Sequence, residues 1–221
     1  MAETLGQQLD SIENMAARLE MMREQEQAMR DVLPVRFELN LAAFRRYIPS
    51  IAERFADYKI KRPFEIFCTD NGIPNLKWLD DGASFYGEHP YEDCITQVEK
   101  VLADTTIIRF NLDYEGDLFG QQHVIYMNEL VRQHKLLLDD VTVLKHVPES
   151  MPLALVFGVG LGYQLAYLYE RCQIANLFLF EPDEDLFYAS LHTFDWAPLL
   201  DYLYGENMGL HIFVGQQDND V

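Results

Sequence analysis

Residues 4–33 place apolar side chains at spacings of three, four or seven, separated by Glu, Gln, Asp and Arg. This is the period of an amphipathic α-helix. Thr4 and Gln7 have the spacing of a capping box, and Pro34 is expected to end the helix. Because the apolar side includes several adaptable methionines, the helix either packs on its own domain or serves as an arm for self-association or docking. The apolar positions are Leu5, Leu9, Ile12, Ala16, Leu19, Met22 and Met29.

A second helical pattern starts at Asn40, which is predicted to be an N-cap with Leu39 and Phe44 forming a hydrophobic staple. Pro49 is expected to kink this helix or split it in two. The buried stripe is predicted to consist of Phe44, Ile48, Ile51, Phe55 and Tyr58.

From Pro63 the apolar runs shorten, which indicates strands. A strand at 64–67 is followed by the turn signal Asp-Asn-Gly at 70–72, and a small hairpin is expected over 76–86. The aspartates in these turns lack the spacing of a calcium loop, so they are interpreted as turn residues. The pattern then predicts three elements: a helix over 91–102, a strand over 105–110 and a helix over 121–138.

The segment 153–183 has the order strand, glycine turn, helix, strand, acid. The apolar run 153–157 precedes three glycines at alternate positions, and the second apolar run 177–180 ends at Glu181. This order is typical of a nucleotide-binding crossover with parallel strands. Strands that are apolar throughout are expected to be covered on both faces. A third apolar strand is predicted at 210–214.

Glycine amides and the following helix N-terminus can bind an anion, and an acid at the tip of the second strand can accept hydrogen bonds from a ribose. The candidate cofactor-binding residues, working or vestigial, are therefore Gly158, Gly160, Gly162 and Glu181.

An alternative assigns these residues to the scaffold. The spacing G-x-G-x-G is nearer to that of methyltransferases than to G-x-G-x-x-G, but Val156 stands where a methyltransferase has an acid. Under this interpretation the glycines permit tight strand–helix packing, and Glu181 caps the next helix. A methyltransferase-like domain that uses S-adenosylmethionine, or another nucleotide-binding domain, stays open as a second hypothesis.

Charge and cysteine content limit the classes of partner and the cellular compartment that are expected for this protein. The 221-residue chain has 17 Lys and Arg against 36 Asp and Glu, a formal net charge of −19. Such a surface repels nucleic acid and anionic membranes, so neither is expected as a partner. Three scattered cysteines without a C-x-x-C pair predict a reduced, cytoplasmic protein with no metal site. No signal peptide is expected, and no nucleophilic triad is identified, because no spacing links the plentiful Tyr, His and Asp residues.

The predicted fold class is α/β, in three parts. Residues 1–36 form an N-terminal helical arm, 37–147 a small α/β region with a hairpin, and 148–221 a Rossmann-like half. Since a complete nucleotide-binding sheet has about six strands, the last part is expected to precede a downstream catalytic domain.

Several motifs resemble the N-terminal domain of the motility accessory factor (Maf) flagellin glycosyltransferases, over about 40–214. They are NLAAFRRYIP, PNLKWLDDG, LVFGVGLGYQL and the run from FEPD through LFYAS to Asp195-Trp196. The resemblance implies a cytoplasmic bacterial enzyme that transfers a nonulosonic acid, of the pseudaminic or legionaminic type, from a CMP-activated donor to Ser or Thr of flagellin.

That family places its sugar-transfer chemistry in a central domain, so the resemblance carries over no catalytic residue and implies no cofactor for this part of the protein. The first hypothesis is therefore a non-catalytic domain for assembly or flagellin recognition. A purely structural interaction module built on the N-terminal helix is a third hypothesis.

Overall fold

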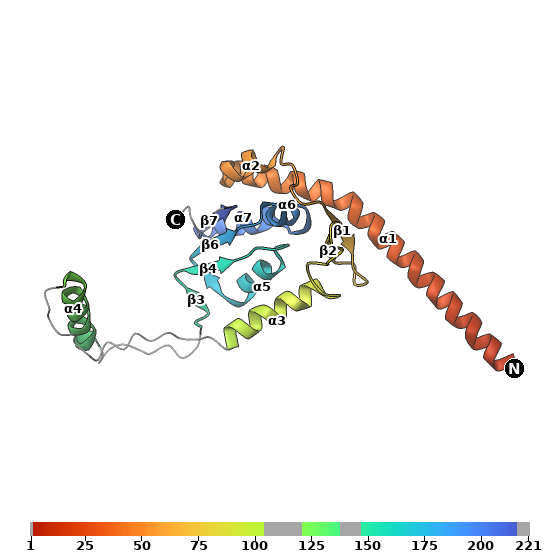
Figure 1. Ribbon diagram of the computed structural model, residues 1–221, viewed down its shortest axis with the longest axis horizontal. Helices are drawn as coiled ribbons and strands as arrows, with labels where there is room; N and C mark the ends of the chain where they lie inside the picture. The colour runs from red at the N-terminus through yellow and green to blue at the C-terminus, as the bar shows by residue number, and fades with distance from the viewer. Residues whose placement is uncertain (1, 104–120, 138–146, 216–221) are drawn as a thin grey trace. The chain divides into compact units, whose positions relative to one another are not determined.

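The computed structural model describes residues 2–103, 121–137 and 147–215, with side chains from Met15 onward (Figure 1). The contacts between residues divide the chain into two compact units. One contains Met1–Glu99 and Glu149–Val221, and the other contains 100–148. The second unit contains α4 (Gln122–Leu137), which confirms the helix predicted there. The strand predicted over 105–110 lies outside the described residues.

The first helix, α1, runs from Ala2 to Tyr47 without interruption, so the predictions that Pro34 ends it and that Asn40 caps a new helix are wrong. Pro34 removes one backbone hydrogen bond, and it does so on an exposed side of the helix. On the other side, Met29 before the proline and Leu41 after it are both buried against the same body. Tertiary packing on both sides of the proline therefore outweighs the lost bond.

The predicted split at Pro49 is confirmed, since α2 (Pro49–Phe55) begins with this residue. The backbone N–H at the first position of a helix has no acceptor within the helix. Proline, which lacks this N–H, therefore loses no hydrogen bond there and is favourable at a helix start. Phe44, Ile51 and Phe55 of the predicted stripe are buried. The Phe44 and Phe55 rings meet the ring of Phe187 at centroid distances of 6.3 and 5.1 Å.

A β-hairpin follows, formed by β1 (Phe64–Cys68) and β2 (Pro74–Trp78), which pair antiparallel around the predicted 70–72 turn. The hairpin expected over 76–86 is reduced to a single bridge between Lys77 and Ser84. The next helix, α3 (Pro90–Ala103), confirms the helix predicted at 91–102.

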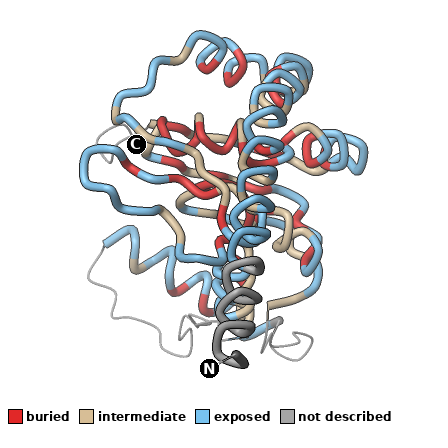
Figure 2. The backbone as a smooth tube through the Cα atoms, turned by 90° about the vertical axis from the view of Figure 1, so that its right-hand side faces the viewer, coloured by how far each residue is buried: buried red, intermediate tan, exposed pale blue. Residues whose placement is uncertain are grey.

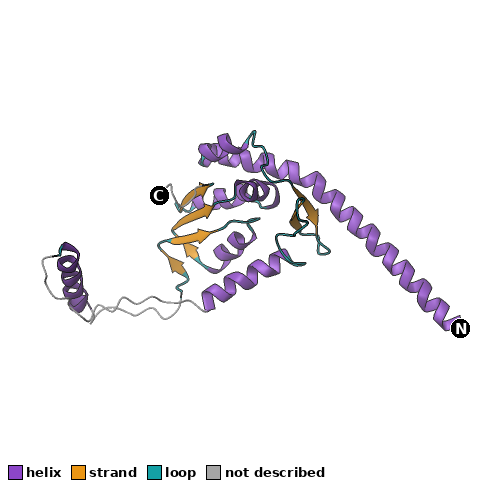
Figure 3. Cartoon of the chain, viewed as in Figure 1, coloured by secondary structure: helices purple, strands orange, loops and turns teal. Residues whose placement is uncertain are grey.

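The central sheet is parallel, in the order β4-β6-β7 (Figure 3). Its strands are β4 (Ala154–Phe157), β6 (Asn176–Glu181) and β7 (Gly209–Val214). The connecting helices are α5 (Tyr163–Arg171), α6 (Glu184–Thr193) and α7 (Trp196–Gly205). A short parallel pair, β3 (Ser150–Met151) with β5 (Gln173–Ile174), completes the described strands. The helix α7 and the short strands β3 and β5 were not predicted. Pro198 lies in the first turn of α7, where proline is tolerated.

The sheet is covered on one face and open on the other within the described part of the chain. Leu177, Leu179 and Leu210 are buried, whereas Leu155 and Phe157 are 53% and 76% exposed. Figure 2 colours the described backbone by burial. The expectation that both faces are covered is therefore wrong for these residues. Consecutive strands added in one direction with right-handed crossovers place their helices on the same face, which explains the asymmetry.

None of the helices in the described ranges has the length and apolarity that a membrane span requires.

Candidate functional site

The glycine turn that joins β4 to α5 lies beside the tip of β6, so the structure brings the four predicted residues together. Gly158, Gly160 and Gly162 have φ angles of +85°, +52° and +92°, which side chains adopt only with strain. The three glycines therefore allow the chain to turn from the strand into the helix within five residues.

Glu181 occupies the centre of this turn. Its Oε2 accepts hydrogen bonds from the backbone N–H groups of Val159 and Gly160 at 2.7 and 3.0 Å. Its Oε1 accepts from the N–H of Asp183 at 3.0 Å, and the residue is only 3% exposed. The carboxylate thus fills the position in which backbone amides of a glycine turn would otherwise hold an anionic ligand.

Two further amides of the turn are bonded to the protein as well. The Gly158 N–H donates to the Phe180 carbonyl at 2.7 Å, and the Gly162 N–H donates to the Val159 carbonyl at 2.9 Å. A phosphate or ribose that binds these amides would have to displace the Glu181 carboxylate. The buried carboxylate would then lose its hydrogen-bond partners, which carries a high free-energy cost.

Two of the glycines are also packed against aromatic rings. A Cβ atom on Gly160 would lie 2.8 Å from Phe85 Cε1 and from the Tyr86 hydroxyl, and one on Gly162 would lie 2.7 Å from Phe194 Cγ. A Cβ on Gly158 would meet nothing within 4 Å. The need for close packing, which the sequence left as an alternative, therefore applies to two of the three glycines.

The helix cap expected from Glu181 is supplied by Asp183. Its side chain accepts hydrogen bonds from the Asp185 and Leu186 N–H groups at 2.9 and 3.3 Å. Glu181 accepts a hydrogen bond from the N–H of Asp183 and so positions the residue that caps the helix. Together these acids fix the end of β6 relative to the start of α6.

Sequence reasoning did not foresee the role of Asp185, which is 3% exposed. It accepts hydrogen bonds from the N–H groups of Lys61 and Arg62 at 2.9 and 2.7 Å, and from the Tyr58 hydroxyl at 2.8 Å. Burial and the adjacent Asp185 carboxylate raise the pKa of Tyr58. The only sequence signal was a run of three acids directly after the strand.

The neighbouring Glu184 forms ion pairs with Lys61 and Arg54. A hydrogen bond from Lys61 holds its pKa below the usual range, with a further contribution from Arg54. Arg54 also donates to the Val214 carbonyl at 2.7 Å. All four acids of the stretch 181–185 are thus engaged in holding elements of the fold together.

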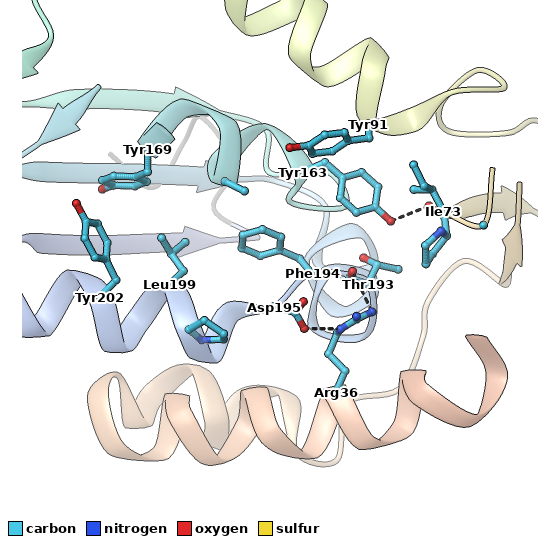
Figure 4. Close-up of a pocket in the computed structure, with 14 residues that line it drawn as sticks. Arg36, Ile73, Tyr91, Tyr163, Tyr169, Thr193, Phe194, Asp195, Leu199 and Tyr202 are labelled. Atoms are coloured by element: carbon cyan, nitrogen blue, oxygen red, sulfur yellow. Dashed lines mark hydrogen bonds and ion pairs between the residues drawn. The ribbon is translucent and has the colours of Figure 1, made fainter. Parts of the chain in front are cut away.

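A separate groove of about 690 Å³ lies along α5 and α7 (Figure 4). None of the four predicted site residues lines it. Arg36 and Asp195 form an ion pair at one end, with 2.6 Å between Nε and Oδ1. Its described lining holds no histidine, cysteine or lysine, so its surface suits apolar contact better than acid–base chemistry. The aromatic residues that line it are Tyr91, Tyr163, Tyr169, Phe194 and Tyr202.

Among the residues that the structure describes, no group of three or more His, Cys, Asp and Glu side chains has the arrangement of a metal site. The described cysteines, Cys68, Cys94 and Cys172, are free thiols, and burial raises the pKa of each.

A parallel sheet with a glycine turn and an acid at the tip of the next strand defines a Rossmann-like α/β domain. Residues 36–221 match the family model of the glycosyltransferase Maf N-terminal domain, and the chain belongs to this family. The family resemblance and the predicted α/β fold class are thereby confirmed.

A solved structure supports the same assignment. The Maf glycosyltransferase from Magnetospirillum magneticum AMB-1 is 26% identical in sequence, with a TM-score of 0.59. The match covers 83% of this chain and 28% of that chain, so this chain corresponds to somewhat more than a quarter of that protein. No curated protein matches the chain significantly.

Proposed function

We propose that this chain is the non-catalytic N-terminal domain of a flagellin glycosyltransferase that works in the bacterial cytoplasm. The whole enzyme would transfer a nonulosonic acid, of the pseudaminic or legionaminic type, from a CMP-activated donor to Ser or Thr of flagellin. This domain would serve assembly of the enzyme or recognition of flagellin. Family membership supports the enzyme class, and the sequence resemblance supports the donor and the acceptor.

The observation that carries the non-catalytic role is the position of Glu181. A working nucleotide turn presents free amides to its ligand, whereas here the amides of Val159 and Gly160 are bonded to a buried carboxylate of the same chain. The glycine turn then acts as a scaffold, and the sugar donor would bind elsewhere in the enzyme.

A thermal-shift screen tests this role. The ligands are S-adenosylmethionine, NAD, CMP and a CMP-activated nonulosonic acid. A ligand present at 100 times its dissociation constant adds about 2.7 kcal/mol of stability, which is a shift of several degrees. We expect no shift with any of the four.

A shift with S-adenosylmethionine or NAD would replace the proposal with the nucleotide-binding hypothesis, provided that Gly160→Asp abolishes the shift. A shift with the CMP-sugar alone would mean that this domain holds the donor, which contradicts a non-catalytic role.

Recognition of flagellin is measured separately, by calorimetric titration of purified flagellin monomer into this protein. Binding supports the recognition role. If neither flagellin nor the remainder of the enzyme, supplied as a separate polypeptide, binds the domain, the proposed function is refuted.

A further inference from the structure

The N-terminal part of α1 buries none of its described side chains before Met22, and it contacts the body there through an exposed ion pair between Arg18 and Asp70. We call residues 2–21 the arm. Every described side chain from Met15 to Met21 is exposed, with Met15 at 63% and Leu19 at 52%. Burial of α1 begins beyond this point, with Met29 at 7%. At 1.5 Å per residue the arm is about 30 Å long. Figure 1 shows it as the N-terminal end of the long helix α1.

A helix of this length is only marginally stable in water unless its apolar side is covered. From the buried Met29 the apolar positions of α1 continue toward the N-terminus in the sequence, at spacings of three, four or seven, through Leu19 back to Leu5. The family match starts at residue 36, so the matched domain does not account for the arm. An additional apolar surface is required to cover these apolar positions.

We propose that two copies of the chain pair through their arms as an antiparallel two-stranded coiled coil. The arm is long enough for about three heptads. A two-fold axis between the two copies then places each apolar seam residue of one chain against a seam residue of the other chain. The heptad seam consists of Ala2, Leu5, Leu9, Ile12, Ala16 and Leu19.

Side-chain volumes select the antiparallel orientation. With residue numbers that sum to 21 across the seam, the layers are Ala2–Leu19, Leu5–Ala16 and Leu9–Ile12, each occurring twice. Every layer then contains at least one large side chain. A parallel pair would instead stack Ala2 on Ala2 and Ala16 on Ala16, which leaves two thin layers in a short seam.

Charge selects the same orientation. Each chain carries a formal net charge of −19. A parallel pair would bring the two folded bodies together at one end of the coiled coil. An antiparallel pair separates the positions of Met22 by about 35 Å along the axis, several times the Debye length of roughly 8 Å at physiological salt.

Analytical ultracentrifugation and light scattering of the intact protein across a concentration series test the pairing. We expect a reversible monomer–dimer equilibrium. Leu19→Glu places a charge in two layers of the dimer and is expected to weaken dimerisation at least about 100-fold. Because Leu19 is half exposed, the variant should keep the thermal unfolding of the body.

Ala17→Glu is the matched control, since it adds the same charge at an exposed position outside the seam. It should leave dimerisation unchanged. A protein that is monomeric at every concentration, or a Leu19→Glu variant that dimerises as well as Ala17→Glu, overturns the proposal.

Orientation is measured by spin-label distances with Glu24→Cys in a Cys68→Ser background, because Cys94 and Cys172 are buried. The antiparallel pair predicts a label separation of about 40 Å, and a parallel pair would place the labels within roughly 20 Å. The short distance would refute the antiparallel arrangement.

Discussion

Glu181→Gln tests directly whether the glycine turn is held by its own acid. The substitution keeps the shape of the side chain and removes one acceptor oxygen and the charge. Three backbone N–H groups bind the two oxygens of Glu181, at 2.7, 3.0 and 3.0 Å. With its oxygen toward Val159 and Gly160, a glutamine keeps two of these bonds but points its NH₂ group at the Asp183 N–H.

The magnitude follows from this count. A hydrogen bond to a charged group contributes about 1.5–3 kcal/mol, and an unpaired buried donor adds a penalty of similar size. The two remaining bonds weaken because their acceptor becomes neutral. We expect a loss of roughly 2–4 kcal/mol, which lowers the melting temperature of a protein of this size by about 4–16 °C.

Urea denaturation at neutral pH, followed by circular dichroism, measures the change. Glu170→Gln is the control, because Glu170 is exposed on α5, and it should alter stability by less than about 0.5 kcal/mol. If Glu181→Gln is as mild as the control, Glu181 does not hold the turn, and its carboxylate would be available to a ligand.

Three further predictions concern other parts of the domain. Asn40 donates to the Leu191 and Phe194 carbonyls and accepts from the Ala197 N–H, so Asn40→Ala should cost roughly 3 kcal/mol in urea denaturation; a loss below 1 kcal/mol would contradict this role. Gly162→Ala should destabilise more than Gly158→Ala, because only the former meets a ring in addition to backbone strain; equal melting temperatures would refute the packing argument. Burial lowers the pKa of His192 to about 4 from 6.5, so below pH 6.5 the unfolded chain takes up a proton that the folded chain does not. Stability should therefore fall by up to about 3 kcal/mol between pH 6.5 and 4, and His192→Phe should remove that share of the slope; an unchanged slope in denaturation at several pH values would disprove it.

The sequence predicted the local elements well where a pattern was strong and short in range. The glycine turn, the flanking parallel strands and the start of a helix at Pro49 follow from backbone preferences that neighbouring residues express by themselves. The acid at the end of β6 was recognised as part of the site for the same reason, because its spacing from the glycines belongs to a single crossover unit.

The function of individual polar residues was decided by distant partners. Asn40 has the sequence context of an N-cap, yet it lies inside α1 and bonds to groups about 150 residues away in the chain. Asp185 similarly binds the backbone at 61–62. No local pattern reports such contacts, because the partner groups are backbone atoms that every residue type carries.

By itself, then, the sequence determined the class of the fold, the family and the residues that meet at the glycine turn. Only the tertiary structure decided that Glu181 occupies the amides of that turn, that α1 continues through Pro34, and that one face of the sheet stays open in the described residues. The physical reason is the range of the interactions. Helical and strand periods arise between residues a few positions apart, whereas packing and buried hydrogen bonds depend on which distant segments the fold brings together.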